Sequence, residues 1–466
     1  MKYLHYYEEE NEFTNGYWGN GYLEPWVSLT TEGTEHVDYN RRQPLTFTVL
    51  QNGTITVDTK SNSGNLYLER DIKYLKDGQM NTISLNSSKK SSSFQVSSGD
   101  VVYFFGDNDR YCEYNDTAET DVFVRIVANC KVNVSGNILS MIKSRNWDRL
   151  KLDNEYSFAY LFSGSSIVSA EELILPSKIY PWCLSRLFYG CNKLTAAPSL
   201  PSKDIEPGCY YGMFCGCSQL TTAPTLPNVE VAKTYCYAEM FNGCVNLEHN
   251  IPTSLPSHLE DWCYFKMFMN CKKITDAPEI QATTVSPWCC GYMFDGCTGL
   301  TTVQTVLPAT TLAEWCYAWM FSGCVSLTNA PELPATTLAE SCYFSMFEYC
   351  TSLRHAQEQL PAKTLVARCY KQMFLGCANL EKAPDILGET GGSTDYVMEA
   401  MFSGCTKVDS LVCLITDYVG YAPTNNWLRG VKEPGTFYKN PSVPTTVITS
   451  PDRQLPSTWS VVDYTG

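Results

Sequence analysis

The chain has 466 residues, of which 44% are hydrophobic and 13% aromatic, and its formal net charge is −15. This composition can bury a sizeable core, and the length suggests about three segments. The negative charge argues against sequence-independent nucleic-acid binding and against attachment to an anionic membrane, since both need a basic surface. No apolar run approaches the roughly 18 residues that cross a bilayer, so membrane insertion is not expected either.

The first segment, residues 1–42, is rich in Tyr, Trp, Glu and Gly and shows no clear period. It lacks the apolar centre and the cleavage site of a secretion signal. The chain is therefore expected either to stay where it is made until another route releases it, or to have lost its signal. We interpret the segment as an anchoring arm that docks on another protein, with an irregular lead-in to the next domain as the alternative.

Residues 43–142 have a β pattern. Leu45, Phe47 and Val49 alternate with threonines, and Asn52-Gly53 then predicts a two-residue hairpin turn. Further short apolar runs follow, separated by turn residues at intervals that are typical of an all-β domain. Seven or eight such strands predict a β-sandwich.

Residues 143–411 are an array of about ten repeats. One phenylalanine recurs at intervals of 26 to 28 residues, at Phe162, Phe188, Phe214, Phe241, Phe268, Phe294, Phe321, Phe347, Phe374 and Phe402. The stretch Cys316–Pro334, C-Y-A-W-M-F-S-G-C-V-S-L-T-N-A-P-E-L-P, shows the common pattern. A period in the twenties indicates a solenoid, because one such unit cannot bury its own apolar face and a stack can.

Two halves are predicted within each repeat. In Thr337–Cys350 the apolar residues recur every four positions, which favours a short helix. A glycine before the second Cys would end that helix, and its replacement by Asn270 and Tyr349 suggests that a left-handed conformation is not needed in every copy. The second half, from Leu327 onward, is extended because prolines exclude a helix. The predicted fold is an α/β leucine-rich-repeat solenoid of 26–27-residue repeats, preceded by the all-β sandwich.

The cysteines are predicted to be reduced core residues. Sixteen of the 22 form eight C-x7-C pairs at equivalent repeat positions. On a helix the two members would lie about 12 Å apart, too far for a disulfide, which needs Cα atoms within about 7 Å. Ser157, Ser165 and Val397 replace Cys in the outer copies, so we expect each position to need a small buried side chain and not a bond partner.

The repeat resembles a known family. Met-Phe-x-Gly-Cys-x-x-Leu-x-x-Ala-Pro-x-Leu-Pro is similar to the BspA-type leucine-rich repeat over about residues 155–410, although Met replaces the typical Ala and the unit is longer. It resembles more closely a subfamily with C-Y-x-x-M-F-x-G-C-T-S-L, found in surface proteins of gut bacteria and in proteins of their phages. The resemblance implies an adhesin or binding protein with a β-domain before the array and a closing segment such as Gly435–Trp459. It carries over no enzymatic residues.

Residues 412–466 are predicted to cap the open end of the array. The whole chain lacks the phosphate-binding, zinc-protease and nucleophile-elbow motifs, so we expect no enzyme and no cofactor. No metal site is expected either. The five histidines share no repeat position, and Cys215-x-Cys217 and Cys289-Cys290 are better explained by packing than by a soft metal. A glycosidase carboxylate pair is not excluded, but no acidic residue is singled out.

The candidate binding residues are those that vary while the repeat frame stays constant. They lie one residue before and three residues after the first Cys, four apart, and so would share one helical face. Rings at these positions could stack on sugars or anchor a protein partner. The alternative is that they pack on neighbouring repeats. The candidate ligand-binding residues are Trp182, Tyr235, Trp262, Trp288, Tyr292, Trp315 and Trp319.

These features predict a non-enzymatic structural or recognition protein. A start at Met1, the absence of a signal, reduced thiols and an adhesin-like architecture favour a phage virion component: a fibre, receptor-binding or capsid-decorating protein. Its N-terminal region would bind other virion proteins and its array a host surface glycan or protein, and we expect a homo-oligomer. The virion surface is the expected location. A bacterial cell-surface adhesin is the alternative, and a fibre-borne glycan hydrolase a more distant one.

Overall fold

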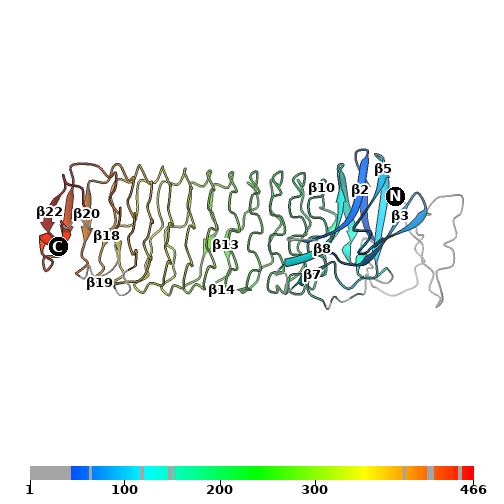
Figure 1. The fold of residues 1–466 in the computed structure, drawn as a ribbon, viewed down its shortest axis with the longest axis horizontal. Helices are drawn as coiled ribbons and strands as arrows, with labels where there is room; N and C mark the ends of the chain where they lie inside the picture. Colours follow the sequence, from blue (N-terminus) through cyan, green and yellow to red (C-terminus); the bar gives the residue numbers. More distant parts are fainter. Residues whose placement is uncertain are drawn as a thin grey trace, which may run out of the picture.

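The computed structural model describes residues 43–61, 66–115, 120–144, 150, 152, 154–391, 395–416, 424–449 and 454–465. The predicted anchoring arm, residues 1–42, lies outside the described residues. The described part is elongated. A domain of long strands lies at one end, and the coils of the repeat array are stacked behind it along one axis as far as β22 (Figure 1).

The domain of long strands consists of two sheets, with strand orders β9-β1-β6-β3-β4 and β5-β2-β8-β7, and β10 (Ile167–Ser169) of the array extends the first sheet beyond β9. Its own strands pair antiparallel. Alternate residues such as Leu45, Phe47 and Val49 are fully buried, and both sheets contribute to one apolar core. The strands are β1 Leu45–Val49, β2 Gly53–Ser61, β3 Arg70–Lys76, β4 Gln79–Leu85, β5 Ser91–Val96, β6 Val101–Gly106, β7 Cys112–Asn115, β8 Thr120–Ala128 and β9 Val132–Asn137.

The predicted hairpin at Asn52-Gly53 is wrong. Strands β1 and β2 belong to different sheets, and neither Asn52 nor Gly53 has the positive φ that a type I′ turn requires. Asn52 instead accepts a hydrogen bond from the backbone N–H of Ser98 at 2.8 Å. A Cβ on Gly53 would lie 2.5 Å from the Cβ of Cys130, so this glycine is needed for close packing where the chain passes from one sheet to the other.

The first coil of the array is built directly onto this domain. Strands β10 (Ile167–Ser169) and β11 (Leu173–Ile174) pair in parallel with β9. On the other side of the coil, the Ile126 N–H of β8 donates to the Leu161 carbonyl at 2.7 Å. The domain therefore covers the first apolar face of the stack, which would otherwise meet water.

Each repeat forms one coil, and its first half has an alternating hydrogen-bond pattern. Around Cys316, the N–H groups of Cys316 and Ala318 donate to carbonyls three residues back in the same coil. The N–H groups of Trp315, Tyr317 and Trp319 donate instead to carbonyls of the next coil. In this part of the repeat, half of the backbone donors thus close tight turns and half join neighbouring coils.

The predicted helix in each repeat is wrong, and this pattern explains why. In Thr337–Cys350, Ser341, Ser345 and Tyr349 all have φ between +50° and +56°, a region that a right-handed helix excludes. Each is the third residue of a turn closed by an N–H to the carbonyl three residues back, which is the signature of a type II turn. Positive φ at every fourth residue produces the same period of four as a helix. The only helices among the described residues are the 3₁₀ turn η2, Ile138–Met141, and α1, Thr445–Ile448.

The left-handed conformation before the second Cys is kept in every described copy. Asn270 and Tyr349, which replace glycine there, have φ of 61° and 56°. The expectation that these copies dispense with it is therefore wrong. Since a residue with a Cβ costs about 1–2 kcal/mol in this region, the ladder between coils outweighs the local preference.

The second half of each repeat is extended, as predicted, and it pairs in parallel with its neighbours. The longest sheet of this part has the order β16-β18-β20-β21-β22. The array strands are short: β12 Val231–Ala232, β13 Ser254–Leu255, β14 His258–Leu259, β15 Glu279–Ile280, β16 Gln359–Leu360, β17 Thr364–Leu365, β18 Asp385–Ile386, β19 Thr390–Gly391, β20 Ser410–Cys413, β21 Thr436–Lys439 and β22 Ser460–Asp463. The array is thus a solenoid of turns and short parallel strands, poor in helix.

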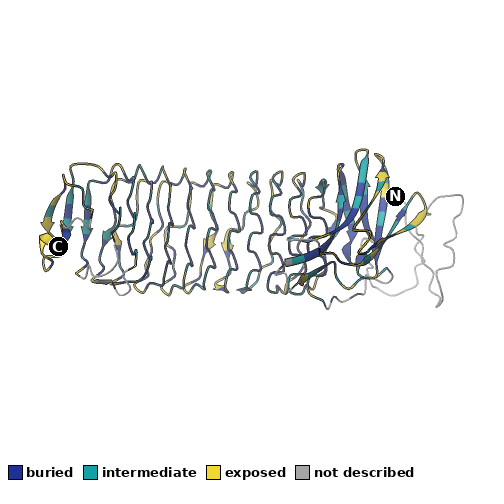
Figure 2. Ribbon diagram, in the orientation of Figure 1, coloured by how far each residue is buried: buried dark blue, intermediate teal, exposed yellow. Residues whose placement is uncertain are grey.

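Inside the coils, equivalent side chains form columns of buried residues. Figure 2 shows buried and partly buried residues along the coils as well as in the long strands. The recurring phenylalanines stack with ring centroids 5.5 to 5.8 Å apart from Phe162 to Phe402. A second column is formed by the tyrosine after the first Cys, for example Tyr237 and Tyr264 at 5.8 Å. These columns extend the core continuously from the β-domain along the array.

All 22 cysteines lie among the described residues and are free thiols. The cysteine at the second position does more than fill space. In nine coils, the eight with a Cys pair and that of Cys405, its thiol donates to the phenylalanine carbonyl of the preceding coil at 3.0 to 3.2 Å, as Cys324 does to Phe294. A disulfide would remove this donor. Burial raises the pKa of these thiols, for example Cys191 to about 12.

The array continues beyond the tenth predicted repeat. Asn426 and Gly430 have φ of 52° and 76°, and the Phe402 N–H donates to the Trp427 carbonyl at 2.8 Å, as in earlier coils. Trp427 and Leu428 take the places of Met and Phe in the buried columns. The segment predicted as a cap, residues 412–466, therefore contains a further coil and the parallel strands β21 and β22.

The tyrosine column leads to a stability prediction. The Tyr237 side chain is 1% exposed and its hydroxyl has no hydrogen-bond partner among the described residues, whereas the Tyr111 hydroxyl donates to the Met141 carbonyl at 2.7 Å. Tyr237→Phe is expected to leave the free energy of unfolding within about 0.5 kcal/mol, and Tyr111→Phe to lower it by about 1–2 kcal/mol. Guanidinium denaturation measures both. Equal losses would contradict the unpaired state of Tyr237.

The left-handed positions lead to a second prediction. Tyr349 is 55% exposed and stands where most copies have glycine, as at Gly376. Tyr349→Gly is expected to raise the free energy of unfolding by about 1 kcal/mol, because glycine adopts positive φ without a steric cost. Tyr349→Ala keeps the Cβ and should give no gain. Stabilisation by alanine as large as by glycine, again in guanidinium denaturation, would show that φ is not the cause.

Candidate functional site

The seven predicted binding residues lie together along one side of the array, although no helical face carries them. The two variable positions are the left-handed third residues of successive type II turns, so their side chains recur in each coil. All seven side chains are half-buried. We call these residues, with Tyr156, Phe265 and Phe344, the aromatic strip.

The rings of the strip stack on one another. Trp262, Trp288 and Trp315 are parallel, with centroids 4.9 Å apart at each step. Tyr292 and Trp319 form a second row at 4.5 Å, and the two rows meet where Trp319 lies 5.8 Å from Trp315. A sugar ring cannot enter between rings at this spacing, because stacked aromatic faces already fill it. The interior members therefore offer their edges, not their faces, to a ligand.

The strip extends toward the β-domain through a gap in the ring series. Gly208 stands where other coils have a ring, and a Cβ there would lie 2.4 Å from the Trp182 ring. Trp182 fills this space and reaches Tyr235 two coils away, at a centroid distance of 5.8 Å. On its other side Trp182 stacks on Tyr156 at 6.0 Å, so the row of rings reaches the first coil.

The strip includes residues that the sequence did not single out. Phe265 packs edge-on against Trp262, Trp288 and Tyr292, and Phe344 tilts against Trp319 at 4.5 Å. Both occupy the position two residues after the first Cys. An aromatic residue recurs at this position, as at Tyr211. This recurrence in the sequence could have identified Phe265 and Phe344 as members of the strip.

Ion pairs lie on both sides of the central rings. Arg186 lies 3.4 Å from Glu239, and its guanidinium sits 4.6 Å from the centre of the Tyr211 ring. Toward the C-terminal coils, Lys371 pairs with Glu399 at 2.6 Å and Arg368 pairs with Glu340. These pairs largely neutralise the charge beside the strip, which leaves its centre mainly apolar.

Three charged residues lie beside the central rings. Lys266 sits 4.7 Å from the centre of the Phe265 ring and 5.3 Å from that of Tyr292, a cation–π arrangement. Burial raises the pKa of the Asp295 and Glu348 carboxyls, with Ser322 and Ser345 hydrogen bonds opposing it. The surface is therefore suited to hydrogen-bonding and apolar contacts more than to binding a strongly charged ligand.

No group of three or more His, Cys, Asp or Glu side chains in the described ranges could hold a metal ion. Burial raises the pKa of Cys215 to about 12, and the Cys289 and Cys290 sulfurs lie 3.7 Å apart within the core. Within the part of the chain that the structure describes, no helix is long and apolar enough to cross a membrane.

The comparisons with known proteins concern the array. The family described as "BspA type Leucine rich repeat region" matches in six copies over residues 158–275 and 264–409, more than half of the chain. No curated protein matches. A crystal structure of a leucine-rich cell surface protein from Faecalibacterium prausnitzii A2-165 is 12% identical, covering 72% of this chain and 91% of that chain, with a TM-score of 0.29. The family match over the turn-and-strand coils leads to one conclusion: this chain belongs to the BspA-type leucine-rich-repeat family.

Proposed function

We propose that the chain is a non-enzymatic recognition protein that adheres to a glycan or protein on a cell surface through the aromatic strip. The observation that carries this proposal is the choice of residue at the left-handed positions. Before the second Cys the chain mostly uses glycine, whereas at Trp262, Trp288 and Trp315 it places large rings at φ of 57° to 59°. Such conformations cost about 1–2 kcal/mol each.

Stacking offsets part of this cost, since an aromatic pair contributes about 0.5–1.5 kcal/mol beyond its buried area. Stacking thus explains why the fold tolerates rings at these left-handed positions. It does not require indoles in three successive coils, because the other left-handed positions hold Ser341, Arg368 or Gln372 without disturbing the coil. Residues held in strained backbone regions are frequently functional, which supports a binding role for the rings.

The exposed edges of the indole rings indicate which chemical groups a binding partner would need. The indole N–H groups of Trp262, Trp288 and Trp315 have no hydrogen-bond partner among the described residues and are not among the enclosed unpaired atoms. They offer a row of donors whose parent rings are 4.9 Å apart. A partner with regularly spaced oxygen acceptors and some apolar surface, such as an extended glycan, suits this row.

The proposal predicts that a Trp262→Ala, Trp288→Ala, Trp315→Ala triple variant loses at least about tenfold in affinity for host cells or surface glycans, the cost of one hot-spot residue or more. The matched control replaces the exposed Thr283, Thr310 and Thr336 of nearby coils with alanine and should bind normally. Binding is measured on intact cells and a glycan panel, with thermal unfolding to check the fold. A folded triple variant that binds like the control would refute the role of the strip.

We further propose that the protein is a component of a phage virion, with its N-terminal region bound to other virion proteins and the array facing outward in a homo-oligomer. The 22 free thiols support assembly in a reducing compartment, because disulfides persist in oxidising ones and nine of these thiols donate hydrogen bonds to phenylalanine carbonyls. A bacterial surface adhesin is the alternative.

Mass spectrometry of purified particles and of cell envelopes distinguishes the two locations. The virion proposal expects the protein in particles released by lysis and its absence from the envelopes of uninfected cells. Detection in those envelopes would contradict it and favour the bacterial adhesin. Depolymerisation of capsular polysaccharide by the purified protein would instead support the fibre-borne hydrolase.

A further inference from the structure

A cavity lies where the β-domain meets the first coil, at the end of the aromatic strip. Its volume is about 400 Å³, and it is shallow and open to solvent. It is lined by Arg110, Glu113 and Tyr114 from the β-domain and by Glu155 and Tyr156 from the array. Neither part of the chain could form it alone.

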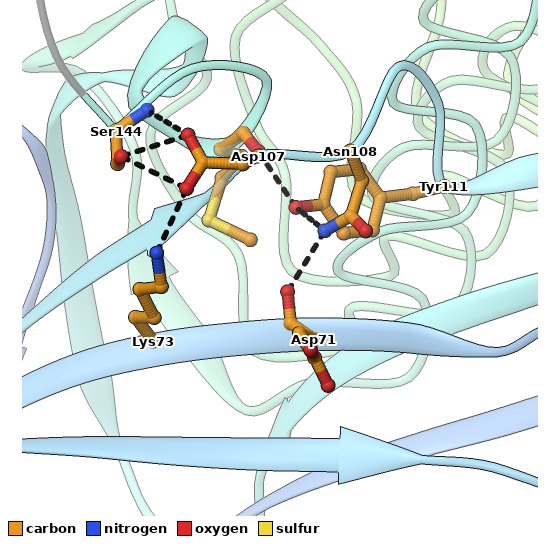
Figure 3. A network of polar contacts seen from close by, with 7 residues as sticks. Asp71, Lys73, Asp107, Asn108, Tyr111 and Ser144 are labelled. Carbon is orange, nitrogen blue, oxygen red and sulfur yellow. Dashed lines mark hydrogen bonds and ion pairs between the residues drawn. The ribbon is translucent and has the colours of Figure 1, made fainter.

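The wall from the β-domain is held in place by hydrogen bonds. Arg70 pairs with Glu113 at 2.7 Å, and its Nε donates to the Arg110 carbonyl at 2.9 Å. The next residue, Tyr111, is fully buried and donates its hydroxyl to the Met141 carbonyl while it accepts from Asn108 at 3.0 Å (Figure 3). These contacts therefore hold the backbone at Arg110 in one position.

A second anchor holds the preceding turn. The Asp107 carboxylate accepts from Lys73 at 2.8 Å and from the Ser144 N–H at 2.9 Å (Figure 3). Burial raises the pKa of Asp107, but the hydrogen bonds from Lys73 and Ser144 outweigh this effect and hold it below its usual value. The carboxylate thus stays ionised at neutral pH and keeps the turn ordered.

The opposite wall is the first ring of the strip. Tyr156 has φ of 57°, and Trp182 stacks parallel to it at 6.0 Å. Among the described residues, Trp182 is the one ring stacked on Tyr156, whereas interior members have a ring on each side. Tyr156 also packs against the buried cluster that contains Phe123 and Tyr160, so only part of its ring is left to line the cavity. Burial raises the pKa of the Tyr156 hydroxyl, and the nearby charges of Asp121 and Glu155 add to this, so it remains a hydrogen-bond donor.

Charged groups of both signs lie at the cavity, and the Asp121 carboxylate also lies near enough to raise the pKa of Tyr156. Arg70 already neutralises Glu113, while Arg110 and Glu155 have no ion pair within the described ranges. Among the described residues, the cavity thus presents the Arg110 guanidinium and the Glu155 carboxylate together with the phenols of Tyr114 and Tyr156. Hydroxyl groups can both donate to the carboxylate and accept from the guanidinium and the phenols.

We propose that this cavity binds a single neutral sugar ring, with the apolar face of the sugar against Tyr156 and its hydroxyls bonded to Arg110 and Glu155. The combination of a guanidinium with carboxylates and phenols favours a hydroxyl-rich ligand over a strongly acidic or basic one. The site is separate from the central rings of the strip, and it would give the protein a contact to one sugar in addition to the extended contact proposed above.

Saturation-transfer-difference NMR on the full chain tests this proposal, with methyl glycosides of glucose, galactose, mannose and N-acetylglucosamine as probes and methyl glucuronide as the charged comparison. At least one neutral glycoside is expected to show transfer. Tyr156→Ala and Glu155→Gln should each reduce the signal at least fivefold, and Tyr156→Phe, which keeps the ring, should retain most of it. Thermal unfolding of each variant checks that the fold is intact.

The remaining outcomes overturn the proposal. These are no transfer to any neutral glycoside, transfer to methyl glucuronide alone, or transfer that survives both Tyr156→Ala and Glu155→Gln. The Trp262→Ala, Trp288→Ala, Trp315→Ala triple variant separates this site from the strip. It should keep the monosaccharide signal, and its loss there, with retention in Tyr156→Ala, would place the sugar on the strip instead.

Discussion

The array depends on one constraint, the division of backbone N–H groups between two destinations. In the turn half of each coil, alternate N–H groups close tight turns and the others bind the next coil, and every fourth residue there has positive φ. A helix would use all of these donors internally and leave the coils joined by side chains alone. The hydrogen-bonded ladder instead brings neighbouring coils close enough for rings in adjacent coils to stack at 4.9 Å.

The same constraint aligns the side chains inside the array. Equivalent residues lie above one another, so a single choice of side chain is repeated as a column. Phenylalanines stack, and the second cysteine reaches back to a carbonyl of the previous coil, as Cys324 does to Phe294 at 3.2 Å. This contact explains why cysteine suits the position better than alanine, which has no donor.

On the outside of the array, this constraint fixes a positive φ at certain positions but does not fix which side chain stands there. Glycine would suit a left-handed residue best, but the middle coils hold Trp and Tyr at two of the three such positions. Because these rings cover one another, the surface they leave is a line of edges, and a free face is expected only where the row ends. Tyr156 is such an end, and it lines a cavity with Arg110 and Glu155.

The sequence by itself determined the solenoid, the number and length of most repeats, the buried columns and the candidate aromatic residues, because each of these is a periodic feature that survives without coordinates. It did not distinguish a helix from a series of type II turns, since both bury residues with a period of four and only the destination of the N–H groups differs. The repeat pattern did not predict the coil around Trp427, because Trp-Leu replaces Met-Phe there. Only the tertiary structure decided which ring faces are covered and which cavity forms between the β-domain and the array, since both depend on residues distant in sequence.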